Sequence, residues 1–340
     1  MAQTPHTETL VMPAEWQSQA CVQLTFPHEH TDWKYMLDEV TQCFVNIARE
    51  IVKHEKLVVV CLDIVTVQEA LKDLNQSQIT YLEIPSNDTW ARDHGGITVL
   101  RNGKPHILDF TFNGWGLKFA ANLDNQITRH LFNHHFFANH VTYSNCLNFV
   151  LEGGSIESDG QGTILTTADC LLSKNRNNLS QHEVEQQLRH YLGAKRIIWL
   201  HHGYLAGDDT DSHVDTLARF CSTHTIAYVQ CTDTADEHYE ELKQMEEELQ
   251  ELGEYQLIPL PMADAIYDQE GQRLPATYAN FLIINHAVLM PTYHSQKDQL
   301  AKQQLQKAFP DRLIIGIDCR SLIKQHGSLH CVTMQYCIDL

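Results

Sequence analysis

Four polar loops of this 340-residue chain contain residues that could do chemistry. Carboxylates occur with His, Trp or Gly in SNDTWARDHGG (86–96), LEGGS (151–155) and GDDTDSHVD (207–215), and GSLHC (327–331) contains a His-Cys pair. Each loop follows or interrupts an apolar segment that is typical of a β-strand. Strand-end loops are where functional residues concentrate. The side chains present are able to bind a cation, transfer protons and attack an electrophile, so we treat the four loops as one candidate site.

The loop 207–215 holds four aspartates and one histidine in nine positions. One interpretation is an acidic turn that caps a following helix, with Asp211 or Ser212 as the N-cap. A second is a metal site in which His213 and neighbouring carboxylates serve as ligands of a metallohydrolase. A third is a clamp for an organic cation, in which Asp215 accepts hydrogen bonds from a guanidinium and His213 acts as acid and base.

The loops 86–96 and 151–155 each place a carboxylate where a cation could bind. Trp90 could lie over a planar cation while Asp93 accepts its N–H groups. The alternative is a buried Trp90 with an Arg92–Asp93 pair on the surface. Glu152 ends a strand and precedes two glycines, which permit a close approach of the backbone, although it could also be an ordinary turn carboxylate.

Cys331 lies in the strand-like segment LHCVTMQ (329–335). A lone cysteine is commonly a buried inert thiol, but a thiolate supplied with a histidine and carboxylates is a nucleophile. His330 is adjacent in sequence, and on a strand its side chain would point to the opposite face. We therefore predict that the separated His213, and not His330, is the partner of Cys331.

Composition limits the classes of partner. The formal net charge is −19, from 43 acidic and 24 basic side chains, which disfavours binding to nucleic-acid phosphate or anionic lipid and suits a small cationic substrate. No apolar run approaches the roughly 20 residues that span a bilayer, and the first residues lack a signal-like segment, so we expect a cytoplasmic protein. The ten cysteines include no CxxC pair, which predicts free thiols and neither a zinc ribbon nor a disulfide framework.

Apolar segments rich in β-formers alternate with amphipathic helical patterns, which predicts an α/β fold. The strand-like segments are 57–65, 78–85, 107–112, 148–154, 162–167, 196–200, 225–231, 278–291 and 312–319. The helical patterns are 33–54, 182–193, 236–253 and 296–309. A strand–strand–helix order recurs about every 60 to 70 residues. No linker-like segment interrupts the chain, so we expect residues 1–340 to form a single domain.

At this point the motifs resemble a known family, the agmatine deiminases and bacterial peptidylarginine deiminases of the guanidine-modifying superfamily. The resemblance covers nearly the whole chain and keeps the family's order of motifs. It rests on MPAEW (12–16), FPHEHTDW (26–33), NDTWARD (87–93), FNGWG (112–116), LEGGSI (151–156), GTILTTADCLL (162–172), GDDTDSHVDTLARF (207–220), YANF (278–281), FPDRLIIGIDCRSL (309–322) and HCVTMQ (330–335).

The resemblance implies a fold and a set of roles. The fold is a five-bladed α/β propeller of the pentein type, with pseudo-fivefold symmetry and a central active site. By motif match, Cys331 is the nucleophile, His213 the general acid and base, and Glu152 the residue that orients the histidine. Asp93 and Asp215 match the carboxylates that hold the guanidinium. Further substrate-binding positions implied by the match are Trp90, Asn280 and Asp211.

The resemblance further implies a cytoplasmic agmatine deiminase that forms N-carbamoylputrescine and ammonia in polyamine biosynthesis. The reaction would pass through a covalent cysteine thiouronium, with no metal and no organic cofactor. The expected partner is a small cationic guanidine, and a homo-oligomer is left open. Alternatives are a deiminase of free arginine or peptidyl-arginine, an amidinotransferase, a metal-dependent hydrolase and a non-catalytic binding protein.

The chain departs from the agmatine deiminase pattern in two places that bear on the substrate. The approach to the nucleophile contains Gly327-Ser328, where many relatives have a glycine-rich segment, and it continues as Met334-Gln335. Within FNGWGLKFAANLDNQ (112–126), Leu117 and Ala120-Ala121 are also unusual. The other histidines, including those of 27–30, 133–140 and 201–202, are interpreted as surface or structural residues.

Overall fold

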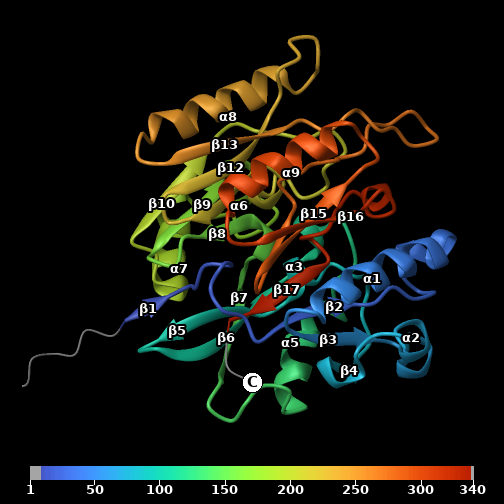
Figure 1. Cartoon of the computed structure of the whole chain (residues 1–340). Helices are drawn as coiled ribbons and strands as arrows, with labels where there is room; N and C mark the ends of the chain where they lie inside the picture. Colours follow the sequence, from blue (N-terminus) through green and yellow to red (C-terminus); the bar gives the residue numbers. More distant parts are fainter. Residues whose placement is uncertain (1–8, 338–340) are drawn as a thin grey trace, which may run out of the picture.

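The computed structural model describes residues 9–337 as an α/β protein (Figure 1). The strands are β1 (Leu10–Val11), β2 (Cys21–Thr25), β3 (Lys56–Cys61), β4 (Ile79–Glu83), β5 (Ile97–Arg101), β6 (Lys104–Thr111), β7 (Thr142–Val150), β8 (Ile156–Ser158), β9 (Thr163–Thr167), β10 (Arg196–Leu200), β11 (Ala218–Ser222), β12 (Thr225–Gln230), β13 (Gln256–Pro261), β14 (Leu282–Ile284), β15 (Ala287–Thr292), β16 (Leu313–Asp318) and β17 (Thr333–Tyr336). The helices are α1 (Leu37–Ile51), α2 (Ile64–Ala70), α3 (Ala91–His94), α4 (Gly114–Leu117), α5 (Asp124–Asn133), α6 (Ala168–Leu171), α7 (Gln181–Leu192), α8 (Tyr239–Glu251) and α9 (Lys297–Ala308).

These strands form five small sheets within residues 9–337. Their strand orders are β1-β5-β6-β7, β10-β9-β8, β11-β12-β13, β14-β15-β16 and β17-β2-β3-β4. Each sheet contains an antiparallel pair whose second strand also pairs in parallel with a third strand: β5-β6 then β7, β8-β9 then β10, β11-β12 then β13, β14-β15 then β16, and β17-β2 then β3. The same small unit therefore occurs five times.

A helix lies between the two parallel strands of every unit. Parallel neighbours cannot be joined by a tight hairpin, so the chain must cross over, and a helix commonly fills that connection. The crossover helices are α1, α5, α7, α8 and α9. This order explains the strand–strand–helix recurrence in the sequence.

The two ends of the described chain meet in one sheet. β17 pairs antiparallel with β2, with Thr333 opposite Leu24 and Tyr336 opposite Cys21. Figure 1 shows the red β17 beside the blue β2. The segment before β17, which carries Cys331, is therefore fixed by hydrogen bonds to the first unit of the chain.

Local sequence explains where the helices form. In α1 the buried residues Val40, Phe44, Ile47 and Ile51 recur at intervals of three and four, which places them on one face. Helix α7 begins with a capping box between Ser180 and Glu183 and ends at Gly193, which adopts a left-handed conformation.

The structure corrects several boundaries. The predicted strand 57–65 ends at Cys61, because the side chain of Asp63 accepts the Val65 N–H and starts α2. The segment 278–291 contains two strands, β14 and β15, that form a hairpin. Helix α5 was not predicted. In the segment 329–335 the strand begins only at Thr333, so Cys331 and His330 lie in the turn before it.

Within the described residues, no helix is both long and apolar enough to cross a membrane. The α/β class is confirmed, and five sheets are present. Their arrangement as the blades of a propeller and the single-domain organisation stay predictions.

We expect Ser180→Ala to destabilise the protein by about 1 kcal/mol, because the Glu183 N–H at the start of α7 loses its side-chain acceptor. Urea denaturation measures this change. Ser180→Asp keeps a capping oxygen and serves as the control. Equal stability of Ser180→Ala and the wild type would show that the capping box contributes nothing here.

Candidate active site

The predicted site residues come from the same position in each of the five units, the segment just before the first strand of the antiparallel pair. Asp93 in α3 precedes β5, and Glu152 precedes β8. His213 and Asp215 precede β11. Asn280 precedes β14, and Cys331 precedes β17. These residues, 238 positions apart from Asp93 to Cys331, are therefore supplied by one repeated structural element.

Cys331 is 4% exposed and lines a cavity of about 160 Å³. Its Sγ lies 3.4 Å from Oδ1 of Asn280, which also accepts the backbone N–H groups of His330 at 2.8 Å and Cys331 at 3.3 Å. Asn280 does not line the cavity. Its position thus favours a role in holding the cysteine turn over one in contacting the substrate.

Gly154 shows how closely the charged groups approach one another. A Cβ atom on this residue would lie 2.6 Å from Nδ1 of His213, 2.8 Å from Oδ1 of Asp93 and 3.1 Å from Oδ2 of Asp215. The three side chains thus surround one point of the backbone. The second glycine of LEGGS leaves room for this arrangement.

Asp93 and Asp215 are both buried carboxylates. Asp93 accepts the indole N–H of Trp115 at 3.0 Å on Oδ2 and the backbone N–H of Gly154 at 3.1 Å on Oδ1. Oδ2 of Asp215 lies 2.7 Å from Nδ1 of His330, whereas its Oδ1 has no hydrogen-bond partner among the described residues. A buried acceptor without a partner is costly, so this atom is ready for an N–H donor of a ligand.

The environment of His213 favours its protonated form. Its ring is completely buried, and Nδ1 lies 3.6 Å from Oδ1 of Asp93. Burial opposes protonation, but the negative Asp93 and the other groups around the ring raise the pKa of His213 to about 10. Burial likewise raises the pKa of Asp93 to about 6, against the opposite effect of His213. Near neutral pH the pair is an imidazolium and a carboxylate.

The thiol of Cys331 lies near the same carboxylates. Burial and then the charges of Asp215 and Asp93 raise its pKa well above the ordinary value. For Asp215 burial acts in the same direction, but the hydrogen bond from His330 and nearby positive charge hold its pKa below the usual range. The site without a ligand therefore combines a neutral thiol with ionised carboxylates.

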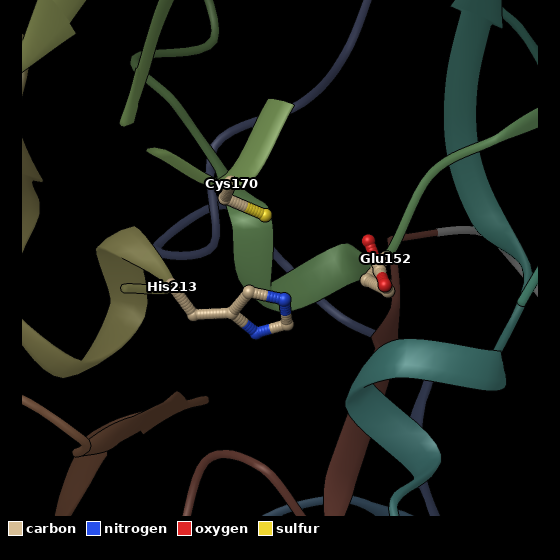
Figure 2. Close-up of side chains that lie close together, drawn as sticks. All are labelled: Glu152, Cys170 and His213. Carbon is tan, nitrogen blue, oxygen red and sulfur yellow. The ribbon is translucent and has the colours of Figure 1, made fainter. Parts of the chain in front are cut away.

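Glu152 and Asp211 are joined by Arg176. Both oxygens of the completely buried Glu152 accept from Nε of Arg176, at 3.0 and 2.9 Å, while Nη1 donates to Asp211 at 2.7 Å. Asp211 also pairs with Lys118 at 2.7 Å and does not line the cavity. The structure places Asp211 in ion pairs that connect loops, and its role in substrate binding stays a prediction. Glu152 lies beside His213, as Figure 2 shows.

The aspartates of loop 207–215 make different contacts in the structure. Asp208 accepts from the Thr210 hydroxyl and the Ser212 N–H, so it is the residue that caps this turn. The predicted cap residues Asp211 and Ser212 both have positive φ and are not N-caps. Asp209 lines the cavity.

The cavity has aromatic walls and an acidic opening. Trp90, Trp115 and Phe119 line it together with Cys331 and Asp93, which are both buried. Asp32, Asp88 and Asp209 add three further carboxylates. A Cβ on Gly327 would lie 2.1 Å from the Trp90 ring, so the chain passes directly against this wall. Glycine at this departure from the family pattern is required for packing.

His330 is the most important contact that the sequence reasoning missed. Its side chain does not face away from the site: Nδ1 lies 2.7 Å from Asp215, and Nε2 lies 2.7 Å from Glu15. Arg219 donates to Glu15 at 2.8 Å and also contacts Glu157. The prediction was wrong because strand alternation does not apply in a turn. The adjacent His-Cys pair and the acidic residue of MPAEW were the available signals.

Residues 11–337 match the family described as Porphyromonas-type peptidyl-arginine deiminase. The chain belongs to this family. A protein of Shewanella baltica (strain OS185) named "Putative agmatine deiminase" is 33% identical over 359 residues, covering 97% of this chain and 95% of that protein. The family resemblance predicted from the motifs is thereby confirmed.

Solved structures agree with this relationship. The "Putative Arginine Deiminase from Porphyromonas gingivalis" is 57% identical with a TM-score of 0.93, covering 96% of this chain and 98% of that one. A cysteine-to-serine variant of C. jejuni agmatine deiminase with substrate bound is 38% identical with a TM-score of 0.93, covering 100% of both chains. The chain is accordingly a hydrolase acting on C–N bonds of amidines, and its relatives support guanidine deiminase activity.

In this deiminase we expect Gly154→Ala to lower kcat/KM about 100-fold, because the added methyl displaces His213 and Asp93 by a fraction of an ångström to about one ångström. Gly154 does not have a positive φ, so the methyl group itself is tested and not backbone strain. Gly316→Ala, whose methyl would meet only Thr292, is the control. Steady-state kinetics on folded protein decide, and a loss below threefold would contradict the crowded geometry.

Proposed function

We propose that this chain is an agmatine deiminase that converts agmatine and water to N-carbamoylputrescine and ammonia. The observation that carries the proposal is one cavity lined both by the buried Cys331 and Asp93 and by three less buried carboxylates, Asp32, Asp88 and Asp209. Agmatine has a guanidinium at one end and an ammonium at the other. A site with carboxylates at both ends matches these two charges.

The inner carboxylates suit a guanidinium. Its planar set of N–H donors pairs well with carboxylate oxygens, and Oδ1 of Asp215 is buried without a partner. Asp93 lines the cavity, where Trp90 and Trp115 provide aromatic walls. Asp93 and Asp215 thus hold the cation while its central carbon faces Cys331.

A bound guanidinium also changes the balance of charge around Cys331. In the empty site, burial and the charges of Asp215 and Asp93 raise the pKa of the Cys331 thiol. The guanidinium and the His213 imidazolium offset those carboxylates, which favours loss of the thiol proton when substrate is present. The nucleophile is then generated where its target is bound.

The reaction follows from these positions. The Cys331 thiolate forms an S–C bond to the guanidinium carbon, and the His213 imidazolium donates its proton to the departing nitrogen. Cleavage of that C–N bond releases ammonia and leaves an S-alkylthiouronium. Neutral His213 then takes a proton from water as the water oxygen attacks carbon. Cleavage of the C–S bond gives the ureido product and restores the thiolate.

Buried neighbours orient the reacting groups. His330 lies between Glu15 and Asp215 and binds Oδ2 of Asp215, which leaves Oδ1 to accept from the substrate. Glu152, which is fixed by Arg176, orients His213 and adds a negative charge near its ring. Asn280 holds the turn that contains Cys331.

The outer carboxylates favour agmatine over arginine. Free arginine and a C-terminal arginyl residue carry a carboxylate near the far end, which would face Asp32, Asp88 and Asp209. Like charges across a binding site disfavour the wrong ligand. The ammonium of agmatine has the complementary charge.

The wider setting follows the same proposal. We infer that the chain is a single domain, that its five sheets are the blades of one pentein-type propeller, and that the segments before β5, β8, β11, β14 and β17 meet near the propeller axis. The enzyme acts in the cytoplasm, in polyamine biosynthesis, without a metal or organic cofactor, and a homo-oligomer remains open.

The proposal is tested by measuring ammonia and ureido formation from agmatine, free arginine and a C-terminal arginyl peptide, with and without EDTA. We expect agmatine to have the highest kcat/KM by at least 100-fold, and activity to persist in EDTA. Cys331→Ser should abolish turnover, and Cys146→Ala, at another buried cysteine, should not. Preference for an arginine substrate, or loss of activity in EDTA, would overturn the assignment.

Asp88 provides a prediction about pH. Burial and then the neighbouring Asp32 raise its pKa to about 7, although hydrogen bonds from Thr89 act in the opposite direction. Asp88 is neutral below that pH and negative above it. We therefore expect the preference for agmatine over butylguanidine, which lacks the ammonium, to increase as pH rises through about 7.

The measurement is kcat/KM for agmatine divided by kcat/KM for butylguanidine across pH 5.5–8.5, a range that extends about 1.5 pH units on either side of the pKa of Asp88. The ratio cancels effects on Cys331 and His213, because both substrates use them. In Asp88→Asn the ratio should be about tenfold lower at high pH, as expected for loss of one charge-assisted contact, and independent of pH. An unchanged pH-dependent ratio would remove Asp88 from recognition of the far end.

A further inference from the structure

A second thiol lies beside the acid–base histidine. Cys170 belongs to α6, the short helix that follows β9, and it is completely buried. Figure 2 shows its sulfur close to the ring of His213, with the carboxylate of Glu152 nearby. The proposed deimination uses His213 and Glu152 but has no step for Cys170.

The three side chains offer one sulfur, one nitrogen and one oxygen ligand. These atoms all lie within 4.8 Å of one another. A tetrahedral Zn²⁺ ion, with bonds of about 2.0–2.3 Å, separates its ligand atoms by roughly 3.5 Å, so an adjustment of about 1 Å would bring the three into range. Thiolate, imidazole and carboxylate are the ligand types that Zn²⁺ combines in proteins.

His213 supplies a second and independent observation. The side chain is completely buried, yet the nearest carboxylate oxygen, Oδ1 of Asp93, lies 3.6 Å from Nδ1, and neither ring nitrogen has a hydrogen bond of good geometry within residues 9–337. Buried polar atoms of this kind usually have a partner. A metal ion bonded to one nitrogen would provide that partner.

The surrounding charges permit a divalent cation. The oxygens of Glu152 already accept from Arg176, but a carboxylate has about four lone-pair positions, so each oxygen keeps capacity for a metal bond. The positive Arg176 is outweighed by Glu152, Asp93 and Asp215 together with a Cys170 thiolate. The cavity is lined by Asp93, and Oδ1 of Asp93 lies 3.6 Å from Nδ1 of His213, so the proposed site lies next to the cavity.

We propose that Cys170, His213 and Glu152 form an inhibitory binding site for a thiophilic divalent metal ion such as Zn²⁺. Formation of the S–Zn bond releases the thiol proton of Cys170, and formation of the N–Zn bond releases the extra proton of the His213 imidazolium. The metal-bound imidazole no longer has a proton for the departing ammonia. This regulation rests on the proposed deiminase function, whereas zinc binding itself does not.

The test compares wild type with Cys170→Ala by calorimetry with ZnCl₂ in a non-chelating buffer and by agmatine turnover. Wild type should bind one Zn²⁺ at this site and lose activity, with recovery in EDTA. Cys170→Ala should retain turnover, bind Zn²⁺ at least tenfold more weakly and require at least tenfold more Zn²⁺ for inhibition. Cys146→Ala, at a buried cysteine on β7, is the matched control.

Cys331→Ser separates this site from the nucleophile. It should still bind Zn²⁺ with wild-type affinity, whereas loss of binding in Cys331→Ser would place the ion on Cys331 and overturn the proposal. Binding of Zn²⁺ by Cys170→Ala with the affinity of the wild type would also overturn the proposal. If Cys170→Ala does not fold, Cys170→Ser preserves the side-chain size with a poorer zinc ligand. Cys170-dependent zinc binding by a protein that fails to deiminate agmatine would refute the proposed function while leaving the metal site intact.

Discussion

The site depends on two buried carboxylates that require a cation. Asp93 and Asp215 are 3% and 0% exposed, and an ionised carboxylate is stable at such burial only when hydrogen bonds and positive charge compensate it. The protein supplies part of that compensation through Trp115, the Gly154 N–H and His330. Among residues 9–337 no group donates a hydrogen bond to Oδ1 of Asp215, so this oxygen is available to a cationic ligand.

The repeated fold explains how such a crowded arrangement is possible. Five units place the segment before the first strand of their antiparallel pair at corresponding positions, and each contributes a different side chain. Hydrogen bonds then join one unit to another: Asn280 holds the Cys331 turn, and Arg176 joins Glu152 to the loop of His213. A site built from several rigid units keeps its groups in place before substrate arrives, which lowers the cost of orienting them.

The sequence predicted the parts of this account that depend on residue type and local pattern. The α/β class, the four polar loops and four of the five crossover helices, α1, α7, α8 and α9, followed from periodicity and loop composition. Loop composition suggested the grouping of Cys331 with His213, whereas the specific roles of the carboxylates needed the family resemblance, because these residues are far apart in the chain.

Long-range contacts set the limit of prediction. His330 was misplaced because β17 begins two residues later than Cys331, and only its pairing with β2 fixes that boundary. The ion pairs of Asp211 with Arg176 and Lys118 were not predicted, because their partners come from distant segments. The acidic opening formed by Asp32, Asp88 and Asp209 likewise depends on three separate loops, which no spacing in the sequence reveals.

The central claim is that Cys331 attacks a guanidinium held by Asp93 and Asp215. Mass spectrometry of enzyme mixed with agmatine and quenched with acid within one turnover tests it most directly. The account predicts an adduct on Cys331 whose mass is that of agmatine less ammonia, absent from Asp215→Asn under the same conditions. An active enzyme that shows no adduct at any quench time, or an adduct on Cys170 or another cysteine, would contradict the account.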